Sequence, residues 1–393
     1  MIRRRSASWV FSVLSASLSM GYGVLFTVVG DFRDEYGISE TAIGAVIGTG
    51  FLAAFVAQVF IAPLADRGRA RELVMIGVLL NVVGLVFMAF GESLGPILLG
   101  RIVSGIGIGT ALPAIRRIVI LADPDNLGEN LGRLLSADVF GFAMGPAVSA
   151  VLVGPLGLAA PFLVVAGLTV AALVPALTVT VDDVRDESGQ RLAVDLLKSR
   201  LVAGAVVLGA TAFMMVGAFD ALWDIVHEDL ETATWMANLG ITLFAVPLVI
   251  LGPTAGRWAQ QYGPYRLASV GLLIGSVFIF LYGQVPTGEW IFAVAMVHAV
   301  TDGLTFAASG VAIAMVVPEA RQAGAQGVMG AAQALIAGIT AIVIGGLYDA
   351  NGRAVAYGVA AVAMVCFVVI GMALAAEFWT RGRHREVVVE TVS

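Results

Sequence analysis

Twelve long apolar segments follow one another along this chain, and they constrain its fold more than any other feature. They lie at about residues 8–30, 41–64, 72–91, 95–118, 131–153, 160–180, 200–223, 234–256, 267–284, 289–317, 323–346 and 354–376. About 20 apolar residues are enough for a helix to cross the hydrocarbon core of a bilayer. Hydrophobic residues make up 59% of the 393 residues and charged residues only 13%, which excludes a soluble globular domain. The sequence therefore predicts an all-α integral membrane protein with twelve transmembrane helices.

The first apolar segment also has the order of a secretory signal peptide, because Arg3, Arg4 and Arg5 precede it. Its apolar run is long enough to span a membrane, and many further spans follow. We therefore interpret it as the first transmembrane helix.

Basic residues are distributed very unequally between the two ends of the predicted helices. Of the 22 lysines and arginines, Arg33 and Arg353 fall at one end and Arg101 lies within a span. The others fall at the end that holds the N-terminus. Because basic loops stay in the cytoplasm, this asymmetry predicts that both termini are cytoplasmic, in a protein of the inner or plasma membrane.

The longest polar interruption, 181–200, divides the chain into two predicted halves. We expect a first six-helix half at 1–180, a cytoplasmic linker at 181–200, a second six-helix half at 201–380 and a cytoplasmic tail at 381–393. The end of the linker alternates leucines with charges, which is typical of a short amphipathic helix on the membrane surface. The loops 62–71 and 256–266 have similar patterns, and such an internal repeat is how many secondary transporters are built.

Residues 96–113, PILLGRIVSGIGIGTALP, combine one arginine with a series of glycines. Arg101 lies about five residues past Pro96, within the hydrocarbon, where a charge costs roughly 3 kcal/mol. Such a residue normally faces a protein interior or a watery cavity; the alternative is a packing helix whose arginine pairs with a buried acid. Gly105, Gly107 and Gly109 would let another helix approach closely.

Three motifs resemble those of the major facilitator superfamily. The loop at Ala62, Leu64, Ala65, Asp66, Arg67, Gly68 and Arg69 resembles the family pattern G-x-L-A-D-R-x-G-R-K/R, with Ala62 for the first glycine and one residue missing before Gly68. Arg101, Gly105 and Gly107 match the fourth-helix pattern R-x-x-x-G-x-G. Gly141, Gly145 and Pro146 match the fifth-helix pattern G-x-x-x-G-P-x-x-G-G, except that Ser149 and Ala150 replace its last glycines.

This resemblance implies a fold of two pseudo-symmetric six-helix halves, with the first, fourth, seventh and tenth helices around a central cavity. It implies that the loop at Asp66, Arg67, Gly68 and Arg69 gates the cytoplasmic side, with Asp66 paired to nearby basic residues. The fifth-helix pattern is associated in the family with antiporters, particularly drug/proton exchangers. In the second half Gln260 and Gln261 replace the acid and the arginine of the loop. The family also implies a monomer.

Three ionisable residues within spans are candidates for proton coupling. His298 and Asp302 are four residues apart and share one helix face. If Trp290 marks the outer interface, Asp302 lies near the middle of the membrane, and we expect it to carry the coupling proton while His298 tunes it. The alternative is a pair that serves only helix assembly. Asp138 is expected to pair with the inner arginines, a coupling role being its alternative.

The predicted substrate cavity combines charged and aromatic side chains. Its candidates are Arg101, Asp220, Tyr22, Phe219, Trp223 and Phe306. Arg101 and Gly105 are four residues apart, as are His298 and Asp302 in the second half. The internal repeat therefore places Arg101 and His298 at equivalent positions, and we expect them to face each other. If Trp223 marks the outer interface, Asp220 and Asp224 are both shallow, and Asp224 is then an interfacial acid. Packing is the alternative role of the aromatic residues, and the charges do not decide between a cationic and an anionic solute.

The predicted function is secondary active transport by alternating access, with proton-coupled export of a small organic, drug-like solute. Uptake by symport or facilitated diffusion is an alternative, as is a receptor or scaffold with the same fold. An intramembrane hydrolase would need a nucleophile beside His298 and Asp302, and Ser309 lies too far along the helix. No phosphate-binding loop is present, so no cofactor other than the proton is expected. A net charge of -6 does not favour nucleic acid, and the single cysteine, Cys366, excludes a cysteine metal cluster.

Overall fold

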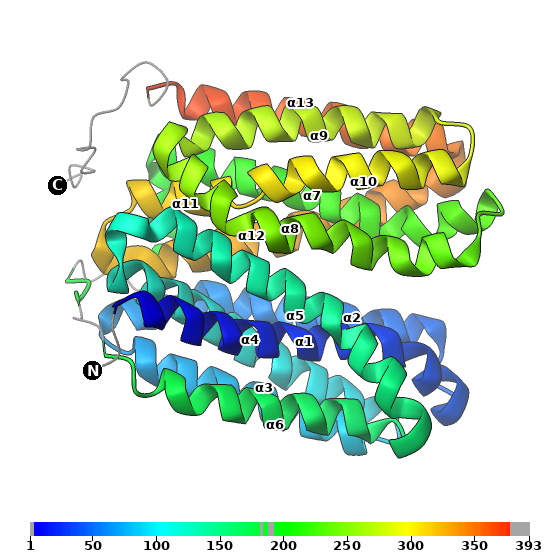
Figure 1. Cartoon of the computed structure of the whole chain (residues 1–393), viewed down its shortest axis with the longest axis horizontal. Coiled ribbons are helices and arrows are strands. Elements are labelled where there is room, and N and C mark those ends of the chain that lie inside the picture. The colour runs from blue at the N-terminus through cyan, green and yellow to red at the C-terminus, as the bar shows by residue number, and fades with distance from the viewer. Residues whose placement is uncertain (1–3, 181–183, 188–191, 378–393) are drawn as a thin grey trace. The chain divides into compact units, whose positions relative to one another are not determined.

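The computed structural model describes residues 4–180, 184–187 and 192–377, and over them the chain is helical throughout (Figure 1). The α-helices are α1 (Arg4–Tyr36), α2 (Glu40–Phe60), α3 (Ala70–Phe90), α4 (Leu94–Ala122), α5 (Leu127–Leu156), α6 (Ala159–Ala176), α7 (Arg200–Asp229), α8 (Thr234–Tyr262), α9 (Pro264–Gln284), α10 (Gly288–Thr305), α11 (Ala308–Val316), α12 (Gln322–Asn351) and α13 (Arg353–Leu374). Short 3-10 helices are η1 (Ala62–Arg67), η2 (Pro124–Asn126), η3 (Ala193–Lys198) and η4 (Glu319–Arg321). Over the described residues, 12 stretches are long and apolar enough to cross a membrane, which confirms the predicted fold class.

The tenth span differs from the single helix predicted at 289–317. It consists of α10 and α11, with an interruption after Thr305. The Thr305 hydroxyl donates to the Thr301 carbonyl oxygen at 2.9 Å, a type of side-chain bond that bends helices. Gly271 of α9 leaves room for Thr305, since a Cβ there would lie 2.3 Å from the threonine Cβ. The predicted surface helix at the end of the linker is η3, only six residues long.

The chain divides into two compact units. The first contains Met1–Asp125, Arg133–Ala193 and Glu319–Ala331. The second contains Asn126–Gly132, Val194–Pro318 and Ala332–Ser393. The start of α12 therefore packs with the first unit, and the start of α5 packs with the second.

Glycines bring the helices of the first unit into backbone contact. On α4, a Cβ at Gly105 would lie 2.4 Å from the Gly50 carbonyl oxygen of α2. On α5, a Cβ at Gly145, just before Pro146, would lie 2.4 Å from the backbone of Gly23 in α1. Gly107, Gly109 and Gly141 make equally close approaches to α3, α2 and α1. The predicted packing positions thus lie where helix backbones meet, as small residues in membrane helices commonly do.

The second unit packs α13 against α9 and α10 against α8 (Figure 1). Its buried core includes Trp223 of α7, Tyr282 of α9 and Tyr357 of α13. This core packs around the first part of α10, which includes Ile291 and Ala295 and comes just before His298. The polar groups of α10 that are described below therefore lie next to an apolar core.

Candidate functional site

The loop between α2 and α3 folds into η1, which places Asp66 in the interior. Pro63 occupies the first turn of η1, and Gly68, with a φ of 85°, ends it in the left-handed conformation that favours glycine. Asp66 is 3% exposed. Its Oδ1 accepts a hydrogen bond from the Ala323 amide at 2.9 Å, and its Oδ2 accepts one from the Gly324 amide at 2.7 Å. The carboxylate therefore caps the first turn of α12, where the helix dipole favours negative charge.

Arg117 of α4 provides the positive charge for Asp66. Its Nε lies 3.3 Å from Asp66 Oδ1, and the side chain is fully buried. The guanidinium also donates to the carbonyl oxygens of Ala65 at 3.2 Å, of Glu319 at 3.3 Å and of Val184. The linker joins the same cluster, since the Asp186 amide donates to the Asp66 carbonyl oxygen at 2.8 Å. We call Asp66, Arg117, Asp186 and Arg321 the Asp66 network; Arg321 Nε lies 3.3 Å from Asp186 Oδ2.

The basic partner of Asp66 is not one that the loop motif contains. Arg67 and Arg69 are both exposed, whereas Asp66 pairs with Arg117, which lies outside the motif. Nothing in the sequence distinguished Arg117 from its neighbour Arg116. Only the packing of α4 against η1 selects it.

The second half contains a neutral version of this arrangement. Gln260, at the position predicted to replace the acid, accepts a hydrogen bond through Oε1 from the Gly128 amide at 2.8 Å. Gly128 is the second residue of α5. In both halves a polar side chain of the loop thus binds the start of a long helix, but only Asp66 does so with a full charge.

His298 and Asp302 form a buried pair in α10. They are 1% and 4% exposed, and His298 Nε2 lies 3.4 Å from Asp302 Oδ1. This separation suits an ion pair better than an aligned hydrogen bond, and Nε2 has no hydrogen-bond partner. Asp302 lies 14 residues from each end of the span Gly288–Val316, immediately before the interruption after Thr305. It is therefore central in the span, and its predicted place near the middle of the membrane stays a prediction.

Tyr282 of α9 holds the other side of the imidazole, and the sequence analysis did not identify it. Its hydroxyl lies 2.8 Å from His298 Nδ1, and it is 1% exposed. Phe278 stacks on His298 with ring centroids 4.8 Å apart, and Phe244 contacts it edge-on at 5.5 Å. The imidazole is thus fixed by one hydrogen bond in an aromatic cage, with Nε2 directed to Asp302.

Arg101 is fully buried in the first unit without a polar partner. Its three guanidinium nitrogens make no hydrogen bond, and the described residues offer it no ion pair. Its Cζ lies 3.8 Å above the Tyr22 ring and 5.7 Å from the Phe51 ring. Gly50 makes this position possible, since a Cβ there would lie 2.2 Å from Arg101 Nε. Cation–π contacts offset only part of the cost of burying the charge. The predicted approach of Arg101 to His298 stays a prediction.

Asp138 of α5 lies against basic and hydroxyl groups of the first unit. Arg116 Nη2 lies 3.5 Å from Asp138 Oδ2, the kind of pairing expected with the inner arginines. Ser15 and Ser19 of α1 donate to its Oδ1, the latter at 3.5 Å. Its role in proton coupling stays a prediction.

The predicted aromatic wall of the cavity is distributed over separate clusters. In the second unit Phe219 stacks on Trp223 at 4.5 Å, while Phe306 contacts Phe213 at 5.6 Å. Trp223 is 2% exposed and α7 continues to Asp229, so the Trp223 side chain packs inside the second unit, and its depth in the membrane stays a prediction. Packing against Gly240 covers it. The side chain of Asp220 lies outside the described residues, and Tyr22 belongs to the first unit.

Within the described residues, no three His, Cys, Asp or Glu side chains come together as metal ligands would. The polar groups that this chain brings together instead are ion pairs buried in or beside membrane-spanning helices. Such groups are costly in a membrane and normally mark ion or solute pathways.

Comparison with known proteins agrees with this arrangement. The chain is 23% identical over 329 residues to the MFS-type transporter SLC18B1 of Rattus norvegicus, covering 77% of this chain and 71% of that protein. It is 20% identical over 216 residues to the quinolone resistance protein NorA of Staphylococcus aureus, covering 53% and 55%. The fold is similar to that of the proton:xylose symporter XylE, with a TM-score of 0.79, 15% identity and coverage of 95% of both chains.

The family model of the Major Facilitator Superfamily matches residues 11–230 and 201–388. These matches take in both predicted halves and the spans that hold Arg101, Asp138 and the His298–Asp302 pair. Relatives in this family are transporters and not enzymes, so the chain is a multi-pass membrane transporter. This protein belongs to the Major Facilitator Superfamily.

Proposed function

We propose that this transporter exports a small organic, drug-like solute in exchange for protons, by alternating access. The observation that carries the proposal is the buried His298–Asp302 pair at the centre of an interrupted span. An interrupted helix near the bilayer midplane is a common site for substrate and coupling ions in secondary transporters. A carboxylate there binds or releases a proton as its surroundings become dry or wet.

The surroundings of the pair support proton exchange between two conformations. Tyr282 and the rings of Phe244 and Phe278 enclose His298 in the present conformation. A conformation that wets α10 would favour the charged carboxylate, and a dry one would favour its neutral form. A transmembrane potential of 100 mV supplies roughly 2.3 kcal/mol per proton, enough to bias an equilibrium of a few kcal/mol.

Two observations support export over uptake. The fifth-helix motif at Gly141, Gly145 and Pro146 places α5 directly against α1, through backbone contacts at Gly23. One relative is named as a quinolone resistance protein. Both favour antiport of a drug-like molecule, and the unpartnered Arg101 offers a charge that a solute can reach when the first unit opens.

The test uses the full chain in proteoliposomes with an imposed pH gradient and an entrapped pH-sensitive dye. A library of small organic compounds is screened for solute-induced proton flux. In Asp302→Asn we expect pH-driven accumulation to be lost while solute exchange is retained, because the amide keeps size and hydrogen bonding but does not titrate. Asp224→Asn, an exposed acid on α7, serves as the matched control.

Transport driven by a pH gradient at the wild-type level in a folded Asp302→Asn variant would contradict proton coupling through this residue. Counterflow in inverted against right-side-out vesicles decides between export and uptake. Binding of a compound without any flux would identify a receptor or scaffold instead.

A further inference from the structure

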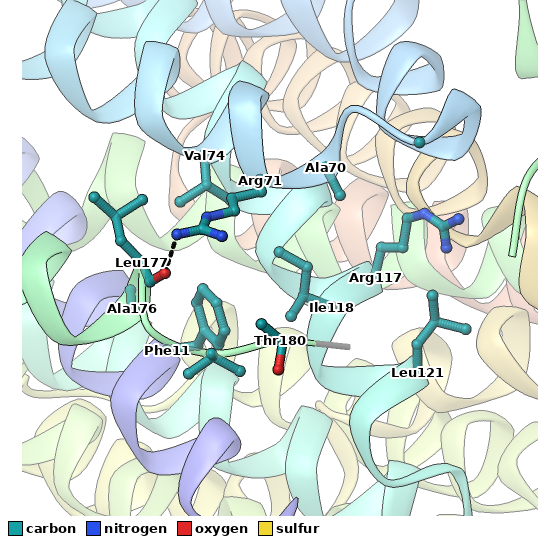
Figure 2. A pocket seen from close by; sticks show the side chains of 12 residues that line it. Phe11, Ala70, Arg71, Val74, Arg117, Ile118, Leu121, Ala176, Leu177 and Thr180 are labelled. Carbon is teal, nitrogen blue, oxygen red and sulfur yellow. Dashed lines mark hydrogen bonds between the residues drawn. The ribbon is translucent and has the colours of Figure 1, made fainter. Parts of the chain in front are cut away.

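A separate cavity of about 190 Å³ lies inside the first unit, beside the Asp66 network (Figure 2). Its lining residues come from α1, from the start of α3, from the end of α4 and from the segment that follows α6: Phe11, Gly68, Ala70, Arg71, Val74, Arg117, Ile118, Leu121, Ala176, Leu177, Val179 and Thr180. Nothing in the transport mechanism above uses it.

Most residues that line this cavity are apolar, and two arginines, Arg71 and Arg117, line it as well; Arg117 already pairs with Asp66. Phe11 and Val74 are each 2% exposed and belong to the walls. Arg71 is exposed, and Figure 2 shows its guanidinium directed to the Leu177 carbonyl oxygen, to which it donates a hydrogen bond. Arg71 makes no ion pair with any residue that the structure describes. Four of its five N–H donors and its charge therefore remain available to an anion.

The cavity lies where helix ends gather on one face of the first unit. α3 begins at Ala70, α4 ends at Ala122 and α6 ends at Ala176. The loop residues Arg67 and Arg69, which flank the lining residue Gly68, are exposed. Ends of membrane-spanning helices lie at the level of the lipid head groups. The positive charge of this loop favours anionic lipid, whose head groups attract basic segments near the surface.

The size of the cavity excludes a whole drug-like molecule. Solute pockets enclose about 300–1,000 Å³, whereas 190 Å³ corresponds to roughly six water molecules. The cavity therefore suits one part of an amphipathic molecule whose remainder lies in the bilayer.

We propose that this cavity binds an acidic phospholipid, with its phosphate at Arg71 and the adjoining part of one acyl chain against Phe11, Val74 and Ile118. Guanidinium groups bind phosphate through paired N–H donors, and the apolar side chains of the lining suit part of an acyl chain. Two lining residues connect the cavity to the Asp66 network: Arg117 belongs to the network, and Gly68 ends η1, the helix that holds Asp66. An occupied cavity therefore stabilises the conformation in which that network is formed.

The experiment measures thermal unfolding and lipid retention of the full chain in detergent. The probes are phosphatidylglycerol, phosphatidylcholine with the same acyl chains, and inorganic phosphate. We expect phosphatidylglycerol alone to raise the unfolding temperature and to remain bound in native mass spectrometry. Arg71→Gln should weaken its binding about five- to tenfold, the effect of one basic residue near an anionic surface.

Two further variants keep the test decisive. Arg257→Gln, at an exposed arginine of α8 outside the cavity lining and outside the first unit, should leave binding unchanged. Ile118→Trp fills the cavity without altering charge and should displace the lipid. Equal stabilisation by phosphatidylcholine or by inorganic phosphate would overturn the proposal, as would equal losses in Arg257→Gln and Arg71→Gln. If Arg71→Gln does not fold, binding that persists in Ile118→Trp overturns it, and loss there supports it.

Discussion

Asp66→Asn is the perturbation that tests most directly how the start of α12 is held. The amide retains the shape of the carboxylate but removes its charge. Asp66 accepts two backbone hydrogen bonds, at 2.9 and 2.7 Å, and lies 3.3 Å from Arg117. The asparagine oxygen accepts one of these bonds at most, because its NH₂ group cannot accept.

The free energy involved follows from the contacts that are lost. A hydrogen bond to a charged group contributes about 1.5–3 kcal/mol, and breaking one partner of a buried ion pair costs about 3–5 kcal/mol. Because Asn retains part of both interactions, we expect a loss on the order of 3 kcal/mol in this conformation. A conformation with α12 released would lose little. The ratio of released to held α12 should therefore rise roughly a hundredfold.

Thiol labelling of Ala193→Cys on a Cys366→Ala background measures this ratio. Ala193 is 2% exposed and lies against α12, since a Cβ at Gly324 would lie 2.6 Å from the Ala193 Cβ. Release of α12 uncovers residue 193, so Asp66→Asn should accelerate maleimide labelling at least tenfold. Glu72→Gln, an exposed acid in the first turn of α3, is the matched control.

An unchanged labelling rate in Asp66→Asn would refute the reasoning, since it would mean that Asp66 does not hold α12. The same acceleration in Glu72→Gln would refute it too, because general loss of negative charge would then explain the effect. Asp66→Glu provides a further check: restored charge without correct length should recover only part of the wild-type protection.

Two further predictions concern the core. Tyr282→Phe removes the 2.8 Å hydrogen bond to His298. Because a neutral hydrogen bond contributes about 0.5–1.5 kcal/mol, the pH profile of transport should shift by roughly 0.4 to 1 pH unit with folding retained. An unchanged profile would show that Tyr282 does not position the imidazole. Gly145→Val places a Cβ within 2.4 Å of the Gly23 backbone and should lower the unfolding temperature in detergent. Gly154→Val, which has open space around it, should leave the unfolding temperature unchanged. Equal unfolding temperatures of the two variants would rule out the contact between Gly145 and Gly23 as a source of stability.

The sequence by itself determined the membrane-spanning architecture. A run of apolar residues needs a helix to satisfy its backbone in lipid, so run lengths alone predicted the twelve candidate spans found over the described residues. The helical period placed His298 and Asp302 on one face, because residues four apart are neighbours on any α-helix. The loop motif and the fourth- and fifth-helix glycines predicted the family.

Only the tertiary structure decided which groups meet. The partner of Asp66 among the inner arginines, the contact of Asp66 with α12 across 257 residues and the contact of Tyr282 with His298 depend on how helices are rotated and packed. So does the interruption after Thr305, where a local hydroxyl bond combines with the space left by Gly271. The hydrophobicity of a segment determines that it forms a helix in the membrane. Because apolar residues surround these helices on nearly all sides, hydrophobicity does not determine how each helix is rotated about its axis. Their rotations are therefore set by close packing of small residues and by the few buried polar groups, which no single segment of sequence specifies.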